Sequence, residues 1–315
     1  MDMNYLVVGA GALGTVFGGM LELSGKLVTY TGLGQHFDEI KQNGIKIEGI
    51  WGNHSVDKIN AYYPNDIENS TGRFDVILLC VKSNDTETAL KPVIHLLKPG
   101  GICISIQNGL GNVEKIKSIT GNDRAAGARV IFGVEINTPG TALVTVYADK
   151  VLLGLPFSRK NQKILEQVSA DLNSAKIPTE ISNNIMGYIW AKALYNCALN
   201  PLGAILQVSY GELADNKNTV DLMNNIIEEI YSVADKMKIE MVIPDAKTYC
   251  EVFYEKLVPP TRKHHSSMYQ DISNGRRTEI DALNGKIVEY GKEFNVNVKV
   301  NEIITSLIKF KQDEN

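Results

Sequence analysis

The stretch Tyr5-Leu-Val-Val-Gly-Ala-Gly-Ala-Leu-Gly14 determines the fold class of this chain. A short apolar run leads into three glycines, and a helical pattern follows. Gly9 permits a tight turn, Gly11 lets the backbone approach a pyrophosphate, and Gly14 lets the helix pack closely on the strand. The helix start then offers N–H groups and a positive dipole end to phosphates. Against the alternative of a glycine-rich turn kept for packing, we predict a dinucleotide site at Gly9, Ala10, Gly11, Ala12, Leu13 and Gly14.

The first half of the chain alternates short β-type runs with helical patterns. The apolar runs, each bounded by Gly, Pro, Asn or Asp, are Tyr5–Val8, Leu27–Tyr30, Val76–Val81 and Cys103–Ile106. This alternation is typical of a parallel sheet covered by helices. After the turn signal Pro139-Gly140 we expect further strand pieces at Ala142–Tyr147 and Val151–Leu155, and then a helix over Asn161–Ala175.

From about Ile181 onward the pattern changes to long segments with a period of 3.6 residues. We predict helices over Ile185–Asn200, Thr219–Met237, Ala246–Leu257, Glu279–Phe294 and Asn301–Lys311. The predicted fold class is therefore α/β, with a Rossmann-type parallel-sheet domain followed by an all-helical domain. We place the dinucleotide-binding domain at residues 1–182 and the helical substrate and catalytic domain at residues 183–315.

The composition is that of a soluble globular protein. The 315 residues are 44% hydrophobic and 22% charged, and the length favours two domains over one core. A net charge of -4 argues against a nucleic-acid or membrane-surface partner. The first strand starts almost at Met1, so we expect no signal peptide and a cytoplasmic protein. Histidines and cysteines show no metal-ligand spacing, and we read the cysteines as reduced core residues: Cys80, Cys103, Cys197 and Cys250.

A polar stripe runs along the predicted helix that begins at Ile185. Lys192, Asn196 and Asn200 follow one another at intervals of four residues, so they share a helix face. Their neighbours are apolar, and burying a charge without a partner costs much free energy. The stripe must therefore face a partner, a cleft or a ligand. A satisfied core or interface stripe is the competing interpretation.

Two further positions fall at the carboxyl ends of predicted strands, where ligands of parallel sheets collect. Lys82 follows the run Val76–Val81, and Gln107-Asn108-Gly109 follows Cys103–Ile106. Taken singly, they could be a solvated lysine and an ordinary Asn-Gly turn. The segment after the second strand, Tyr30–His36, carries neither a carboxylate for a ribose hydroxyl nor an arginine for a 2′-phosphate. The missing acid favours NADP over NAD only slightly.

With these residues assembled, the sequence resembles the 2-dehydropantoate 2-reductase, or ketopantoate reductase, family. The resemblance extends over nearly the whole chain. Its most specific motifs lie near the C-terminal end and are absent from generic Rossmann dehydrogenases. The matching segments are the glycine turn, Val81-Lys82-Ser83, Gln107–Asn112, Lys192–Leu202, Ser266–Asp271 and Arg277–Asp281.

The resemblance implies that a nicotinamide cofactor, usually NADPH, reduces ketopantoate to pantoate for coenzyme A synthesis. It implies catalytic roles for Lys192 and Glu279, the latter also near the cofactor. It implies substrate contacts at Asn196, Asn200, Ser267 and Asn108, and further cofactor contacts at Lys82 and Asn108. Many members carry an arginine after the second strand, and this chain lacks it. NAD(H) is therefore not excluded, and Lys82 with polar groups around Thr31–His36 would have to neutralise a 2′-phosphate.

Two other functions are compatible with the sequence. A related lysine-dependent hydroxyacid dehydrogenase would act on another small keto acid. A non-catalytic dinucleotide sensor would bind the cofactor without turnover and would not need Lys192. The oligomeric state is also open, a homodimer included.

Overall fold

The computed structural model describes residues 3–70 and 72–313. Contacts divide the chain into two compact units. One, the nucleotide-binding unit, comprises Met1–Gln107 and Asn112–Ile185; the other, the helical unit, comprises Asn108–Gly111 and Met186–Asn315. This division differs from the predicted ranges mainly because residues 108–111 group with the helices. That the units are independent domains stays a prediction.

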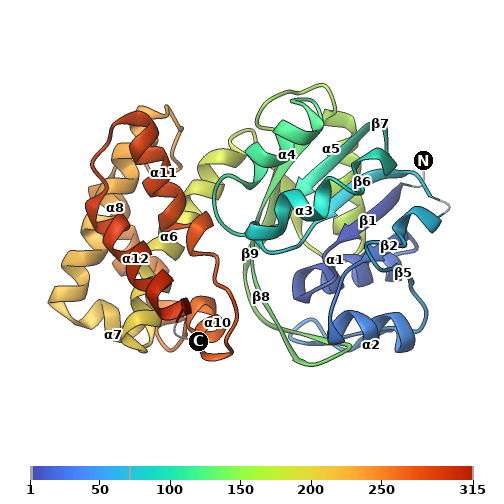
Figure 1. Cartoon of the computed structure of the whole chain (residues 1–315), viewed down its shortest axis with the longest axis horizontal. Helices are drawn as coiled ribbons and strands as arrows, with labels where there is room; N and C mark the ends of the chain where they lie inside the picture. The colour runs from blue at the N-terminus through green and yellow to red at the C-terminus, as the bar shows by residue number, and fades with distance from the viewer. Residues whose placement is uncertain (1–2, 71, 314–315) are drawn as a thin grey trace. The chain divides into compact units, whose positions relative to one another are not determined.

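The nucleotide-binding unit is built on a mostly parallel sheet (Figure 1). Its strands are β1 (Asn4–Val8), β2 (Leu27–Thr31), β3 (Ile45–Gly49), β4 (His54–Val56), β5 (Asn60–Tyr62), β6 (Phe74–Leu79), β7 (Leu97–Ser105), β8 (Ala125–Thr138), β9 (Thr141–Gly154) and β10 (Thr179–Ile181). The order is β4-β3-β9-β8-β7-β6-β1-β2-β5, with β10 beside β9. From β5 to β8 all neighbours are parallel. The chain reverses direction across the sheet between β1 and β6, which is the topological switch point of a Rossmann fold.

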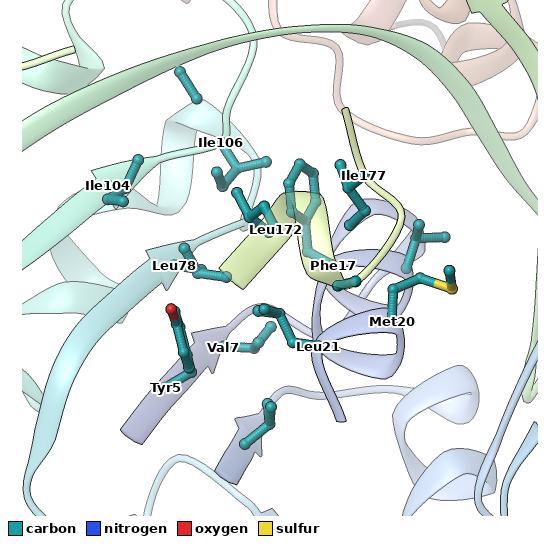
Figure 2. Close-up of a cluster of buried hydrophobic side chains, with 14 of the residues drawn as sticks. Tyr5, Val7, Phe17, Met20, Leu21, Leu78, Ile104, Ile106, Leu172 and Ile177 are labelled. Carbon is teal, nitrogen blue, oxygen red and sulfur yellow. The ribbon is translucent and has the colours of Figure 1, made fainter. Parts of the chain in front are cut away.

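Two helices cover one face of this sheet, and their side chains form the main core. The helices of the unit are α1 (Ala12–Leu23), α2 (Gln35–Asn43), α3 (Thr86–Leu90), α4 (Asn112–Thr120) and α5 (Gln162–Ser174). Figure 2 shows Phe17 and Leu21 of α1 and Leu172 of α5 over Val7 and Leu78 of the sheet. Because alternate strand residues point to opposite faces, Leu6 and Ile77, also fully buried, face the other side.

A buried charged cluster fastens α5 to β1. The Asp171 carboxylate of α5 accepts a hydrogen bond from the Tyr5 hydroxyl at 2.6 Å and contacts the Lys26 ammonium at 2.8 Å. Gln167 donates a further bond at 2.9 Å. Burial alone would raise the pKa of Asp171, but these hydrogen bonds and the charge of Lys26 hold it below its ordinary value. The cluster is thus stable only with the carboxylate ionised.

The helical unit contains only helices and turns among its described residues. They are α6 (Ile185–Leu206), α7 (Tyr210–Asp215), α8 (Lys217–Lys236), α9 (Ala246–Val252), a π-helical turn η4 (Phe253–Leu257), η5 (Pro259–Thr261), α10 (Ser267–Ser273), η6 (Ile280–Ala282), α11 (Asn284–Phe294) and α12 (Lys299–Asp313). Their core is formed around α6, where Leu194 and Cys197 are fully buried and Trp190 stacks on Tyr290.

Helix α6 continues through a proline because another side chain compensates for the missing donor. Pro201 has no N–H to give to the carbonyl of Cys197, four residues earlier. The Cys197 carbonyl instead accepts a hydrogen bond from Nδ2 of Asn284 at 3.2 Å. Asn284 is fully buried and also donates to Asn301 Oδ1 at 3.0 Å. The start of α11 is therefore tied to α6 at this point.

The predicted fold class is confirmed, and several element boundaries are wrong. The helix predicted to end at Asn200 runs on to Leu206 for the reason just given. The two strand pieces after Pro139 are one long strand, β9, whose antiparallel partner β8 was not predicted. The segment from Glu279 begins with the short turn η6, and α11 starts only at Asn284.

Replacing Asp171 with Asn should lower the free energy of unfolding at pH 7 by about 2–4 kcal/mol, because it leaves Lys26 without its anionic partner in a buried setting. The folded-state pKa of Asp171 is below its unfolded value of about 3.9, so this stabilisation is complete above that pH. It disappears as the pH falls through the folded value. Denaturant unfolding of wild type, Asp171→Asn and the exposed control Asp57→Asn at pH 7 and at steps down to about pH 2 measures both the stabilisation and its loss. An unfolding free energy for Asp171→Asn equal to that of Asp57→Asn at pH 7 would contradict the prediction.

Candidate active site

The glycine turn has the close contacts that its sequence predicts. Gly9 has φ of +94°, and an added Cβ there would lie 2.6 Å from the Val81 backbone nitrogen. A Cβ on Gly14 would lie 2.3 Å from the Gly9 carbonyl oxygen. At Gly11, by contrast, a Cβ would meet no protein atom within 4 Å. Gly9 and Gly14 are therefore required by the fold, whereas Gly11 leaves open space beside the backbone.

The first turn of α1 is suited to hold phosphate. Gly11 is the N-cap, no side chain caps the helix, and no acidic residue lies in its first turn. The leading N–H groups of a helix lack partners within the helix, and its dipole favours an anion there. Together with the open space at Gly11, this arrangement fits a dinucleotide pyrophosphate. Gly9, Ala10, Gly11, Ala12, Leu13 and Gly14 form this turn.

Lys82 lies at the switch point of the sheet. The end of β6 adjoins the end of β1, where the Cys80 N–H donates to the Val8 carbonyl at 2.8 Å. Lys82 follows as the exposed residue that precedes the short turn η2 (Ser83–Asp85). Gln107, at the end of β7, donates from Nε2 to the Val81 carbonyl at 2.9 Å. Three neighbouring strand ends are thus linked by hydrogen bonds, which is where topology predicts a dinucleotide.

The segment after β2 contains a histidine that the protein keeps neutral. The Gly140 N–H donates to His36 Nδ1 at 3.0 Å, so the ring proton is on Nε2, which contacts Thr15 Oγ1 at 2.9 Å. Burial lowers the pKa of His36. Thr15 Oγ1 in turn lies 3.4 Å from the Ala10 carbonyl of the glycine turn. His36 therefore supports that turn, and the expectation that polar groups around Thr31–His36 help to neutralise a 2′-phosphate stays a prediction.

In the helical unit, Lys192 has a partner from a distant part of the sequence. The Lys192 ammonium, half-buried on α6, donates to Oδ1 of Asn108 at 2.5 Å. Asn108 belongs to the turn after β7, which groups with the helices. An amide oxygen orients an ammonium and adds no negative charge of its own. The polar stripe thus contains an ammonium whose position is set in part by Asn108.

The other two members of the stripe differ in their surroundings. Asn200 is 4% exposed, and its Oδ1 accepts a hydrogen bond from the Tyr210 hydroxyl at 2.7 Å. Its carbonyl accepts another from Ser266 Oγ at 3.1 Å. Asn196 is half-buried, and its side chain has no hydrogen-bond partner among residues 3–70 and 72–313. Asn200 therefore has a structural bond in addition to any ligand contact, and Asn196 is available.

Ser267 and Glu279, the two predicted site residues furthest along the chain, lie at the starts of short elements. Ser266, not Ser267, is the N-cap of α10, and its Oγ accepts from the Tyr269 N–H at 3.0 Å. Ser267 is exposed at the first position of that helix. Glu279 is half-buried at the N-cap of η6, and its carbonyl accepts from the Ala282 N–H at 3.0 Å. Reasoning from sequence missed Tyr210, a buried hydrogen-bonding residue outside every motif, and gave no role to Ser266, although Ser266 begins one of the matching segments.

The parallel sheet and the glycine turn are those of a Rossmann-type dinucleotide-binding fold. Two family models match: "Ketopantoate reductase PanE/ApbA" over residues 5–155 and its C-terminal counterpart over residues 184–312. The 2-dehydropantoate 2-reductase of Aquifex aeolicus is 39% identical, covering 99% of this chain and 98% of its own length. That of Pyrococcus abyssi is 35% identical, with 98% of each chain covered.

Solved structures of related proteins have the same fold. A D-mandelate dehydrogenase with NADH and anilino(oxo)acetate superposes with a TM-score of 0.88 at 27% identity, with 99% of each chain covered. A PanE/ApbA family ketopantoate reductase from Ralstonia eutropha JMP134 gives 0.86 at 29% identity and the same coverage. Fold and relatives define an oxidoreductase of the dinucleotide-binding class. The chain belongs to the ketopantoate reductase PanE/ApbA family.

Gly11→Ala should weaken binding of the reduced dinucleotide at least about tenfold, or about 1.4 kcal/mol, and leave the melting temperature unchanged. The added methyl group fills space beside the phosphate-binding turn but touches no protein atom. Gly14→Ala is the contrasting variant, because its methyl group collides with the Gly9 carbonyl and should lower the melting temperature. Fluorescence titration and thermal unfolding measure both quantities. Wild-type affinity in a folded Gly11→Ala protein would refute the cofactor assignment of this turn.

Proposed function

We propose that this protein reduces 2-dehydropantoate to pantoate with a nicotinamide dinucleotide, in pantothenate and coenzyme A biosynthesis. The observation that carries the proposal is the half-buried Lys192 ammonium held by Asn108 at 2.5 Å, on a helix whose other faces are apolar. Full-length similarity to 2-dehydropantoate 2-reductases supports the choice of substrate. The four unpaired cysteines fit a cytoplasmic location.

Ketone reduction places a hydride on carbon and a proton on oxygen. The bound reduced nicotinamide supplies the hydride, and the glycine turn with Lys82 would hold the dinucleotide. Negative charge grows on the carbonyl oxygen in the transition state, and a positioned cation stabilises it. Lys192 provides that charge and then the proton, as general acid. Asn108 keeps the ammonium in one position and adds no charge of its own.

The remaining proposed residues bind and orient. Asn196 and Asn200 would hydrogen-bond the hydroxyl and carboxylate of the substrate, with Ser267 as a further donor. Asn200 is already fixed by Tyr210, which would pre-orient its amide for this role. Glu279 would act as a carboxylate near Lys192 and the cofactor. Its negative charge would favour the ammonium form, so that the neutral lysine left after turnover takes up a proton from solvent.

We further propose NADPH as the preferred cofactor. Since His36 is neutral, the 2′-phosphate would be held by Lys82 and by the leading N–H groups of α2, which no side chain caps. The segment Gly32–Gln35 contains no carboxylate to repel a phosphate.

Because no arginine adds to this contact, the preference for NADPH should be modest. Comparing kcat/KM for NADPH and NADH with ketopantoate tests it. A preference for NADH of about tenfold or more, roughly 1.4 kcal/mol, would reverse the proposal. If kcat/KM were similar with NADH and NADPH, the proposed reaction would stand, and the proposed contacts to the 2′-phosphate would be refuted.

A hydroxyacid dehydrogenase acting on another keto acid is the second candidate. It is favoured by the similarity to D-mandelate dehydrogenase at a TM-score of 0.88. A panel of ketopantoate, phenylglyoxylate and branched 2-keto acids separates the two functions by their kcat/KM values. Absence of turnover with every keto acid would favour a dinucleotide sensor instead.

Lys192→Ala should lower kcat about 10²–10³-fold, or roughly 3–4 kcal/mol, because it removes a donor that acts in the transition state. Cofactor affinity should stay near the wild-type value. Lys217→Ala, which removes an exposed lysine at the start of α8, is the matched control and should keep wild-type kcat. Circular dichroism verifies that both variants are folded. Near-normal kcat in Lys192→Ala would show that the stripe is structural.

A further inference from the structure

The turn between β7 and α4 is anchored on both sides by residues of the nucleotide-binding unit. On one side, Gln107 Nε2 donates to the Val81 carbonyl and to Thr86 Oγ1, each at 2.9 Å. On the other, Asn112 Nδ2 donates to Ser83 Oγ at 2.9 Å. The four residues between these anchors, Asn108–Gly111, are called the tip below. The ends of the tip are therefore fixed in position.

The tip itself packs on the turn η6 of the helical unit. The Leu110 N–H donates to the Ala282 carbonyl at 2.7 Å, and the Leu110 side chain is buried in the helical core. Gly109 has φ of +86°, and an added Cβ would lie 2.6 Å from the Ala282 oxygen and 2.8 Å from its Cβ. Only glycine at 109 and a small residue at 282 permit so close an approach.

This contact fixes the residue that holds Lys192. Asn108 immediately precedes Gly109, and its Oδ1 is the acceptor of the Lys192 ammonium. Ala282 also bonds through its N–H to the carbonyl of Glu279, one turn earlier. The contact between Gly109 and Ala282 therefore connects Asn108, which accepts the hydrogen bond of Lys192, with the turn η6. The proposed acid Glu279 is the N-cap of that turn.

We propose that Gly109 and Ala282 are positioning residues for the proton donor: their contact holds Asn108 where it orients the Lys192 ammonium. The inference rests on the proposed function of Lys192 as general acid. The inference also assigns a function to the tip: it positions Asn108 for the lysine of the helical unit, to which the tip belongs. Neither residue touches the substrate in this account, and both act through Asn108.

The test compares three variants. Gly109→Ala forces the tip away from Ala282 and should lower kcat about 10–100-fold, the equivalent of losing a hydrogen bond to a charged group. Asn108→Ala should give a similar loss without backbone strain. Gly121→Ala is the control, because Gly121 has φ of +88° but open space around its Cβ, and should keep kcat within about twofold of wild type.

The pH dependence of kcat distinguishes a lost positioning of Lys192 from a general loss of structure. An amide acceptor favours the charged ammonium, so in Gly109→Ala and Asn108→Ala the alkaline fall of kcat should move to lower pH. A loss of amplitude with an unmoved alkaline limb would overturn the proposal, as would wild-type kcat in Gly109→Ala.

A second measurement does not depend on turnover. Competitive acetylation, read by mass spectrometry with Lys217 as internal reference, should show faster labelling of Lys192 in Gly109→Ala and Asn108→Ala than in wild type. Unchanged labelling would refute the positioning role even if the proposed reaction holds. Faster labelling in a protein that reduces no keto acid would sustain the positioning and reject the proposed function.

Discussion

The close approach of Gly14 to the Gly9 carbonyl is the constraint on which the nucleotide-binding unit depends. A side chain at either position would collide with backbone, so α1 could not start directly after β1. With this contact in place, Phe17 and Leu21 of α1 reach the sheet and form its main core with α5. The same geometry leaves the start of α1 uncapped. The contact that packs α1 on β1 thus lies next to an uncapped helix start that fits an anion.

A comparable constraint operates in the helical unit, where a charged lysine lies on a largely buried helix. The cost of burying this charge is reduced by one amide oxygen from Asn108. On the same helix, the Cys197 carbonyl, which Pro201 leaves without its helical donor, accepts a hydrogen bond from Asn284. The Asn200 side chain accepts one from the Tyr210 hydroxyl. These bonds tie α6 to the starts of α11 and α7.

The sequence predicts the fold class because its decisive signals are local. Glycine spacing, short apolar runs and helical periodicity each depend on neighbouring residues. Strand β8 begins with Ala125, Ala126 and Gly127, which have low β-propensity, and its later β-type run Val130-Ile131-Phe132 was overlooked. The end of α6 was misplaced since its continuation depends on Asn284, a residue far along the chain. Proline signals cannot reveal such compensation.

The candidate site likewise has features that the sequence predicts and features that depend on residues distant in the chain. The glycine turn and the spacing of Lys192, Asn196 and Asn200 are visible in sequence, whereas the bond between Asn108 and Lys192 is not, since it joins residues on separate elements. The neutral state of His36 likewise depends on Gly140, which lies 104 residues further along the chain. Roles inferred for Ser267 and Glu279 come from family resemblance, and the structure adds their positions at the starts of α10 and η6.

The most direct test of the account is to identify the product formed from ketopantoate and dinucleotide that carries deuterium at the transferable position of its nicotinamide. Mass spectrometry and NMR of the product measure where the label resides. We expect pantoate with one deuterium on the carbon that bore the keto group, since the hydride goes to that carbon and the proton from Lys192 goes to oxygen. Recovery of unchanged ketopantoate, or of pantoate without the label, would contradict the account.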